Sequence, residues 1–172
     1  MHPIAESISG SRYASLAAAD AGTPLAALEQ FYAAFNARDL GLMARNWART
    51  DDIALDNPLG GIRRGWAEIQ PLYERLFSGP ARVYVEFHDY TLHAGPELFY
   101  AVRRGRGHFR CGGHEIALAI RTSRVFRDAG DGWKQVHHHG SIEAPVLPRY
   151  RAAVLGAQSG PGAVNGGRNG EG

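Results

Sequence analysis

The chain has 172 residues and a mass of 18.7 kDa, which is the size of one globular domain. Hydrophobic residues make up 44% and charged residues 21%, values that exclude a collagen, a coiled coil and a wholly disordered chain. The formal net charge of +2 is too small to predict a nucleic-acid-binding protein. No apolar run reaches the roughly 20 residues of a membrane span, so we expect no contact with a membrane.

Composition and short motifs also indicate in which cellular compartment the protein works and which cofactors it can bind. Cys111 is the only cysteine, which excludes an internal disulfide framework and a cysteine-based zinc cluster. The N-terminus lacks the cationic start and apolar core of a secretory signal, so we expect a cytoplasmic protein. Gly60-Gly61 and Gly112-Gly113 lack the strand–helix context of a phosphate-binding loop, and we expect no cofactor.

The two ends of the chain differ in composition from the middle. Residues 1–22 are rich in small residues without clean periodicity, and residues 156–172 form a glycine-rich tail. We expect both segments to be disordered and to contribute nothing to the core. The folded domain is therefore predicted to cover residues 23–155.

Three helices are predicted before residue 80. Thr23 suits the N-cap of a first helix, and apolar residues then recur at helical spacing. A second, short helix follows Asp39, and a third covers Trp66–Phe77. Because proline fits the first turn of a helix, Pro71 indicates that the third helix begins near Glu68.

The strands are predicted from alternating hydrophobicity. Ile53–Asp56 reads as a short strand that ends in a turn at Asn57–Gly61. After Gly79 the period changes to two, and tight turns separate four long strands, Arg82–His93, Leu98–Cys111, Glu115–Arg127 and Trp133–Ser141. Three helices followed by an antiparallel meander predict an α+β protein.

The alternation of apolar and polar residues along the strands also predicts which side chains point toward the helices. On the third long strand the apolar set Ile116, Leu118 and Ile120 defines the inner face, and the same parity places Thr122 and Arg124 inside. A buried arginine needs a partner or a ligand. On the last strand, His138 opposes a set that we expect to form the outer face, unless a bulge interrupts the strand: Trp133, Gln135, His137 and His139.

Three segments carry a family resemblance: FYAAFNARDL, IALDNPLGGIRRG and RVFRDAGDGWKQVHHHGS. Together with the order of elements they resemble the cone-shaped fold of nuclear transport factor two and ketosteroid isomerase. The spacing of Trp133, His137, His139 and Ser141 is similar to that of the SnoaL-like branch. It is also similar to that of the association (hub) domain of calcium/calmodulin-dependent kinase. The resemblance covers about residues 25–150 and implies three N-terminal helices packed on a curved antiparallel sheet.

The isomerase's catalytic residues do not carry over. The resemblance places Asn57 where the isomerase family has its aspartate base, and an amide does not abstract protons. The two oxyanion-hole positions become Phe31 and Thr122. Asp56 or Tyr32 could substitute only if the register shifted by one residue. We therefore expect no ketosteroid-type isomerisation.

The hub-domain resemblance implies an arginine-lined pocket. Two of that domain's pocket arginines match Arg103 and Arg124, and a third position falls on Gly140. Two guanidinium groups in an apolar cavity would bind a carboxylate. In a cone fold, core and pocket residues overlap, so Trp47 and Trp66 are further candidates for the lining.

The histidine run admits several interpretations. His137 and His139 share one strand face, but two nitrogens do not complete a metal site, so we predict none. They could instead line an inter-subunit face with Trp133, which predicts a homodimer. His138, on the opposite face, is either an acid–base group in the pocket or a core histidine.

The sequence predicts a protein that binds a small molecule in a cavity, and two functions remain open. One is a cofactor-free lyase, isomerase or hydrolase of the SnoaL-like kind acting on a small, anionic organic substrate. The other is a non-catalytic ligand-binding or hub-like assembly module. The predicted lining is Tyr32, Trp47, Asn57, Trp66, Arg103, Thr122, Arg124 and His138. An acidic residue in the cavity would favour the enzyme, and a cavity of arginines and aromatics would favour the binding module.

Overall fold

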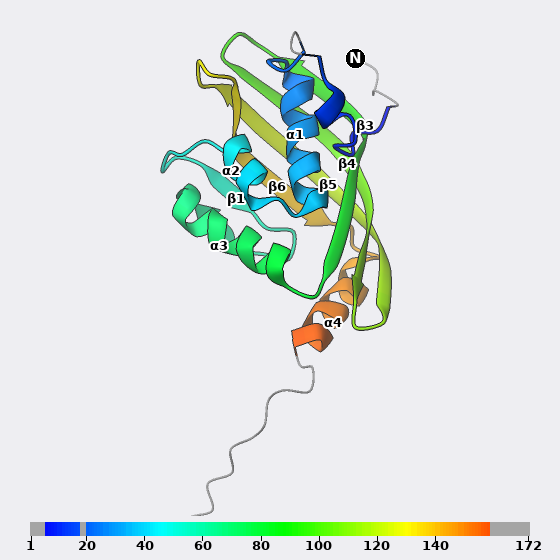
Figure 1. Ribbon diagram of the computed structural model, residues 1–172. Coiled ribbons are helices and arrows are strands. Elements are labelled where there is room, and N and C mark those ends of the chain that lie inside the picture. The colour runs from blue at the N-terminus through cyan, green and yellow to red at the C-terminus, as the bar shows by residue number, and fades with distance from the viewer. Residues whose placement is uncertain (1–5, 18–19, 159–172) are drawn as a thin grey trace, which may run out of the picture.

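The computed structural model describes residues 6–17 and 20–158 (Figure 1). The helices are the 3-10 turn η1 (Tyr13–Ser15), α1 (Pro24–Ala37), α2 (Leu40–Asn46), α3 (Gly65–Ser78) and α4 (Leu147–Gln158). The strands are β1 (Ala54–Asp56), β2 (Ile62–Arg64), β3 (Arg82–Ala94), β4 (Leu98–Cys111), β5 (His114–Asp128) and β6 (Trp133–Ile142). The predicted α+β class is confirmed. No helix among these residues is long and apolar enough to cross a membrane.

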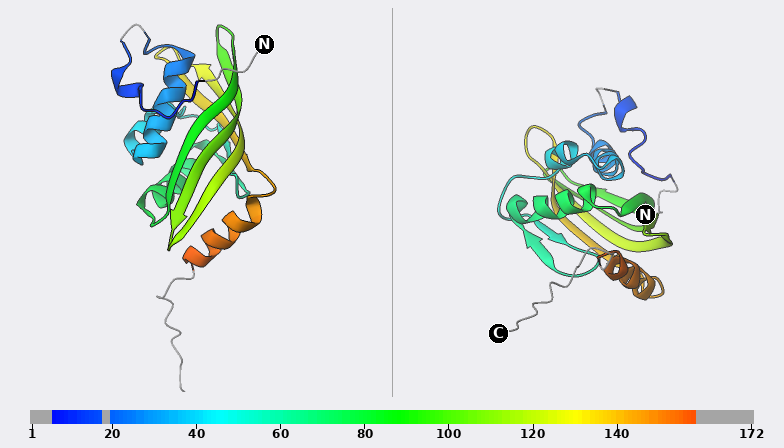
Figure 2. Two further views of the ribbon diagram at one scale, coloured as in Figure 1. Left: turned by 90° about the vertical axis from the view of Figure 1, so that its right-hand side faces the viewer. Right: turned by 60° about the horizontal axis from the view of Figure 1, so that its bottom comes forward.

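One curved sheet carries all six strands in the order β2-β1-β6-β5-β4-β3. Helices α1, α2 and α3 cover the same face of this sheet, and α4 lies near the tip of the β4–β5 hairpin (Figure 1, Figure 2). The core between the two layers is strongly aromatic, and its largest fully buried side chains include Phe31, Tyr32, Trp47, Phe87, Phe99, Phe109 and Phe126.

Two details differ from the expected order of helices followed by an antiparallel sheet. Only α1 and α2 precede the first strand, because the β1–β2 hairpin stands between α2 and α3. Strand β1 pairs in parallel with β6, so the sheet is mostly rather than wholly antiparallel. This pairing places the turn after β1 beside the centre of β6, where it becomes one wall of the cavity described below.

The helix boundaries follow from local caps. The Thr23 hydroxyl accepts a hydrogen bond from the amide of Ala26 (3.2 Å) and begins α1, and Arg38 ends that helix in the left-handed region with φ 59°. The expected start of α3 near Glu68 is wrong. That helix begins at Gly65, and the Glu68 carboxylate accepts a hydrogen bond from the amide of Arg64 (2.9 Å), which stabilises its first turn.

The N-terminal segment contributes to the core, contrary to the expectation for residues 1–22. Ile8 is fully buried, and its backbone exchanges two hydrogen bonds with that of Phe87 on β3. Residues 1–5 and 18–19 lie outside the described residues. Composition did not indicate this docking because only Ile8 and the half-buried Tyr13, which do not form a periodic pattern, provide its apolar contacts with the core.

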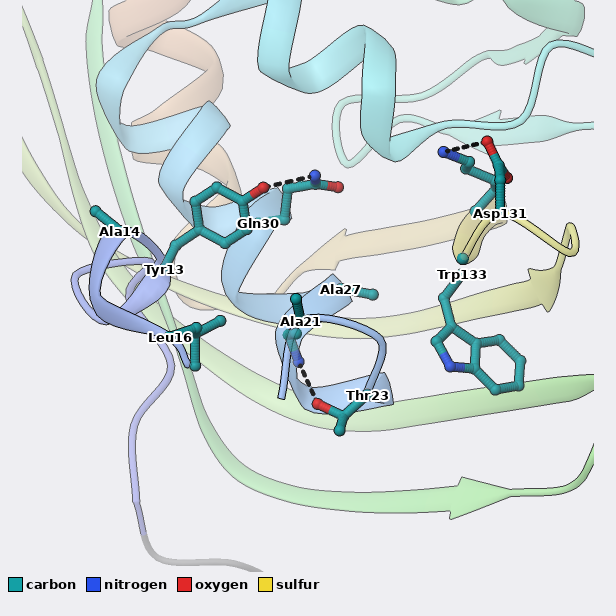
Figure 3. Close-up of a pocket in the computed structure, with 12 residues that line it drawn as sticks. Tyr13, Ala14, Leu16, Ala21, Thr23, Ala27, Gln30, Asp131 and Trp133 are labelled. Carbon is teal, nitrogen blue, oxygen red and sulfur yellow. Dashed lines mark hydrogen bonds and ion pairs between the residues drawn. The ribbon is translucent and has the colours of Figure 1, made fainter. Parts of the chain in front are cut away.

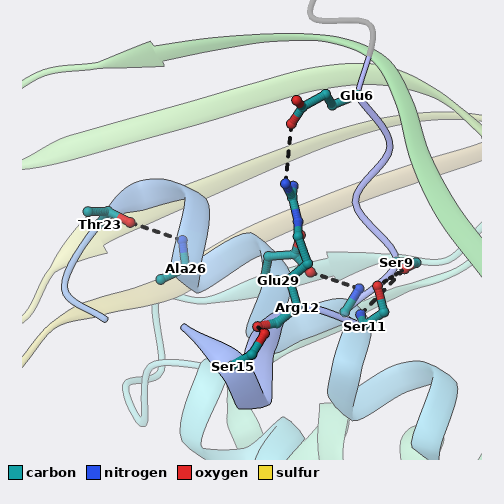
Figure 4. Close-up of polar contacts among 9 residues, drawn as sticks. Glu6, Ser9, Ser11, Arg12, Ser15, Thr23, Ala26 and Glu29 are labelled. Atoms are coloured by element: carbon teal, nitrogen blue, oxygen red, sulfur yellow. Dashed lines mark hydrogen bonds and ion pairs between the residues drawn. The ribbon is translucent and has the colours of Figure 1, made fainter. Parts of the chain in front are cut away.

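A buried carboxylate anchors the same segment. Glu29 of α1 is 1% exposed, and it accepts hydrogen bonds from Arg12 Nε (3.1 Å) and from the amide of Gly10 (3.0 Å). Arg12 also reaches Glu6 at 3.2 Å (Figure 4). The Arg12 side chain is 46% exposed, so solvent partly screens this ion pair, and the buried Glu29 carboxylate is anchored by the amide of Gly10 as well as by Arg12.

The C-terminal helix α4 was not anticipated. It begins at Leu147 and includes residues 156–158 of the expected disordered tail, whereas residues 159–172 lie outside the described residues. Tyr150 of α4 packs edge-on against Phe109 of β4, with ring centroids 5.1 Å apart. This contact places α4 over one end of the concave face.

Substitution of Ile8 tests the docking of the N-terminal segment. Ile8→Ala should lower the free energy of unfolding by about 2–4 kcal/mol, because it removes a fully buried side chain from a packed core. Ala14→Ser, on the exposed surface of the same segment, should change it by less than about 0.5 kcal/mol. Urea unfolding measures both variants, and equal stability of Ile8→Ala and wild type would contradict the docking.

Candidate functional site

A cavity of about 440 Å³ lies between the concave face of the sheet and helices α1 and α3. Its apolar wall comes from both layers, with Phe35 and Leu72 on the helices and Leu118 and Ile120 on β5. Its polar lining comes from every layer of the fold: Asn57, Arg63, Tyr73, Arg75, Arg103, Thr122, Arg124, His138 and Tyr150. The described lining holds four arginines and no carboxylate.

Arg124 is fixed at the inner end of this cavity by neutral partners. It is 3% exposed, as the parity of β5 predicted. Its Nη1 donates to the side-chain oxygen of Gln135 (2.7 Å) and its Nε donates to the Tyr32 hydroxyl (3.2 Å). The guanidinium carbon lies 3.4 Å from the centre of the Phe31 ring. A cation stacked on an aromatic face in this way keeps its charge without an ion pair.

Arg103 lies beside Arg124 on the neighbouring strand. It is 5% exposed, donates to the carbonyl oxygen of Glu86, and stacks 4.6 Å from the centre of the Phe87 ring. Its Nε has no hydrogen-bond partner among the described residues. Burial lowers the pKa of Arg103 from its usual value to about 10, and repulsion from Arg124 acts in the same direction. The group is therefore still cationic at neutral pH.

A glycine makes room for Arg103. A Cβ at Gly105, two residues further along β4, would lie 2.5 Å from the guanidinium carbon of Arg103. Any side chain at this position would displace the guanidinium group. Gly105 thus allows the arginine to lie flat along its own strand toward the cavity.

Neither buried arginine has a carboxylate partner within residues 6–17 and 20–158. Asp56, the acid nearest to this wall in the sequence of β1, does not neutralise either of them. Leu55 faces the core, so Asp56 faces the outside of the sheet, where it lies 2.6 Å from His139 Nδ1. The two guanidinium groups therefore face a shared cavity with their charges compensated only by aromatic rings and neutral oxygens.

His138 completes the inner end. It is 8% exposed, its ring stacks on Phe31 at 6.4 Å between centroids, and its Nδ1 has no partner among the described groups. Burial holds the pKa of His138 well below its usual value of 6.5, and repulsion from Arg124 and Arg103 adds to this. The imidazole is therefore neutral, with a nitrogen available to a ligand.

A bulge in β6 overturns part of the predicted outer face. Val125 pairs with His137 and Phe126 with Gln135, so Val136 has no partner in the ladder and the parity changes there. Gln135 is therefore fully buried against Arg124, and Trp133 packs edge-on against Phe99 in the core. The alternation of hydrophobicity gave no sign of the extra residue.

The structure brings five of the eight predicted site residues to the cavity: Asn57, Arg103, Thr122, Arg124 and His138. The other three do not line it. Tyr32 lies behind Arg124 as its hydrogen-bond partner, and Trp47 is 1% exposed in the core. Trp66 packs under Arg49 and donates its indole N–H to Gln70 (2.6 Å).

Sequence reasoning missed the residues that lie farthest from the sheet centre. Arg63 and Arg75 were not singled out, and Tyr150 belongs to the unexpected helix α4. The spacing of Leu72, Arg75 and Leu76 on one face of α3 was a usable signal for Arg75. No comparable signal indicated Tyr150, because it required the position of α4.

A second cavity, of about 390 Å³, lies between the N-terminal segment, the start of α1 and the β5–β6 turn (Figure 3). Tyr13, Gln30 and Trp133 contribute to its lining. Gln30 donates to the Tyr13 hydroxyl (2.9 Å), and Lys134 lies 3.5 Å from Asp131. Since these polar groups already have partners, the arginine-lined cavity is the better candidate for a binding site.

The neutral state of His138 predicts a pH effect on stability. Below pH 6.5 the unfolded chain gains a proton on this residue that the folded protein does not take up, so stability falls as the pH falls. Between pH 7.5 and pH 5, His138→Gln should lose about 2 kcal/mol less stability than wild type. Urea unfolding at several pH values measures the difference.

The control for this effect is His114→Gln, at the exposed β4–β5 turn, which should retain the wild-type acid sensitivity. Parallel pH profiles for wild type and His138→Gln would show that His138 takes up a proton while folded, and would contradict its burial as a neutral group.

Solved structures with the same fold include hub-like and enzyme-like proteins. A protein of Thiobacillus denitrificans, provisionally assigned as a calcium/calmodulin-dependent protein kinase type II association domain, is 31% identical, with a TM-score of 0.57 over 70% of this chain and 95% of that one. A provisionally assigned dehydratase of the NTF2-like family from Streptomyces avermitilis is 19% identical, with a TM-score of 0.63 over 68% and 91%. At 19% identity this second similarity concerns the fold alone.

The family assignment comes from the sequence. No curated protein matches the chain. Residues 25–145, well over half of the chain, match the family model of the SnoaL-like domain. This range runs from the start of α1 to just beyond β6 and includes all six strands. The resemblance found in the sequence is confirmed, and the protein belongs to the SnoaL-like family, with the NTF2-like fold.

Proposed function

We propose that this protein binds a small organic carboxylate in the arginine-lined cavity and acts as a ligand-binding module. The observation that carries the proposal is the pair Arg103 and Arg124, two buried cations without a carboxylate partner in the described part of the chain. Buried cations without a counter-ion are costly, and a ligand carboxylate would lower that cost by hydrogen bonding to both. The apolar wall would hold the hydrocarbon part of the ligand.

The lining also favours binding over chemistry. A cofactor-free lyase, isomerase or hydrolase usually needs a carboxylate or histidine with a pKa near the working pH. The described lining contains no Asp or Glu, and the lowered pKa of His138 makes it a weak base. Its unpartnered Nδ1 nevertheless makes His138 the residue on which a catalytic function would depend.

Calorimetry on the full chain tests the binding function. Hexanoate and phenylacetate should bind, and the corresponding amides should bind at least about tenfold more weakly, because hydrogen bonds to an anion are stronger than those to a neutral amide. Arg124→Gln and Arg103→Gln should each weaken carboxylate binding by about tenfold or more. Arg121→Gln, on the exposed face of the same strand as Arg124, is the matched control and should bind as wild type does.

Two results would contradict the proposal: equal affinity for acids and amides, or equal affinity of wild type and Arg124→Gln. Arg124 also donates hydrogen bonds to Gln135 and Tyr32, so Arg124→Gln could unfold the protein. Arg124→Lys, which retains the charge, is the second variant for that case. NMR spectra of the bound carboxylate over hours then separate the two functions. An unchanged ligand supports a binding module, and conversion that disappears in His138→Gln supports the enzyme.

We also propose that the outer face of the sheet associates with a second copy of this chain. Tyr100 and Val102 of β4 are 39% and 45% exposed on that face, and His137 and His139 lie on the same side. Apolar side chains on an open sheet face are commonly covered by a partner. Trp133 does not support this proposal, because it is half-buried with its ring against Phe99 on the inner side of the sheet.

Light scattering at micromolar concentration should give twice the mass of one chain. Val102→Glu should give a monomer, because it places a charge within the apolar part of this face. Ala14→Glu, exposed on the helix side of the molecule, is the control and should remain dimeric. A monomeric wild type would refute the dimer, and a dimeric Val102→Glu would place the interface elsewhere.

A further inference from the structure

The four arginines that line the cavity fall into two groups that differ in burial. Arg103 and Arg124 are 5% and 3% exposed and form the inner end. Arg63 and Arg75 are exposed to solvent while lining the same cavity, so they lie where the cavity opens. The apolar side chains of Leu55, Leu72, Leu118 and Ile120 complete the wall of the cavity.

The register of the β1–β2 hairpin directs Arg63 toward the cavity. Arg63 pairs directly with Leu55 in this antiparallel ladder. Residues directly opposite in an antiparallel pair lie on the same face of the sheet. Leu55 is 3% exposed and lines the cavity, so Arg63 shares the inner face, whereas its neighbour Arg64 takes the other.

Helical spacing directs Arg75 toward the cavity. Leu72, Arg75 and Leu76 stand at positions i, i+3 and i+4 of α3, and all three line the cavity. The nearby acid Glu74 lies on another face, where it accepts a hydrogen bond from Gln70 (2.7 Å). Neither Arg63 nor Arg75 forms an ion pair with a carboxylate in the described part of the chain.

We propose that the ligand is an elongated dianion of the α,ω-dicarboxylate class. One carboxylate binds to Arg103 and Arg124 at the inner end, a contact that rests on the proposed function. The second binds to Arg63 and Arg75 at the opening, and the hydrocarbon chain between them lies along the apolar wall. Guanidinium groups suit this role because each binds a carboxylate through two parallel hydrogen bonds.

Solvent exposure limits how much affinity the second carboxylate adds. Ion pairs at a partly exposed opening are weaker than those in a closed cavity and are screened by salt. The dicarboxylate should therefore gain affinity of about tenfold at low ionic strength over a monoanion of the same length. In 0.5 M NaCl this gain should shrink to about twofold or less.

Titration of matched ligands into the full chain tests the inference. The probes are the dicarboxylates from adipate to sebacate, each compared with its own monomethyl ester, which keeps the length and removes one charge. At the optimal length the diacid should bind about tenfold more tightly than the ester. The double variant Arg63→Gln, Arg75→Gln should reduce that ratio to about two, because it weakens binding of the diacid more than binding of the ester.

Arg64→Gln provides the matched control, because it removes a cation from the same strand on the opposite face. It should retain the full ratio of diacid to ester affinity. A ratio near one in wild type, or a ratio unchanged in the double variant, would overturn the inference and leave the carboxylate-binding function intact. Absence of binding for diacids and esters alike would overturn the proposed function itself.

Discussion

The cavity is arranged around two cations that are buried without a counter-charge in the described part of the chain. Arg103 and Arg124 lie on adjacent strands and point into the same cavity. The fold tolerates them through aromatic faces and neutral oxygens: Phe31, Tyr32 and Gln135 around Arg124, and Phe87 with a backbone carbonyl around Arg103. Such partners hold a guanidinium in place without neutralising it, so the charge remains available to a ligand. A carboxylate partner within the protein would stabilise the arginine and remove that capacity.

The pairing register of the strands decides which side chains reach this cavity. The sequence predicted the inner face correctly on β5 but not on β6. Parity along β5 correctly placed Thr122 and Arg124 inside, because Ile116, Leu118 and Ile120 mark one face without interruption. The same reasoning failed on β6, where one extra residue at Val136 moves Gln135 to the inner face. A bulge changes hydrogen bonding rather than composition, so alternation cannot reveal it. The partner that fixes Arg124 was therefore assigned to the wrong face.

The segments that dock at the two ends of the domain were equally missed. Ile8 and Tyr13 attach the N-terminal segment without a periodic pattern, whereas Leu147, Tyr150 and Val154 of α4 stand at a helical spacing that was not used as a signal. Gly140 is another feature that the sequence alone could not explain. The hub-domain resemblance treated it as a lost arginine position. A Cβ there would lie 2.7 Å from Pro58 Cγ and 3.1 Å from His138 Nε2, so the loop after β1 already fills the space that a side chain would need. Only the packing of Pro58, which lies 82 residues earlier in the chain, explains this glycine.

Phe87 connects the N-terminal segment with the cavity. Its backbone exchanges hydrogen bonds with Ile8, and its ring lies under the guanidinium of Arg103. The adjacent residue, Glu86, supplies the carbonyl that accepts from Arg103. Strand β3 is the edge of the sheet, and an edge strand without a partner is free to twist or fray. Ile8 pairs with the free edge of β3 at this point. The N-terminal segment therefore holds in place the two groups that position Arg103, the Phe87 ring and the Glu86 carbonyl. The segment thus supports the binding site, although none of its described residues lines the cavity.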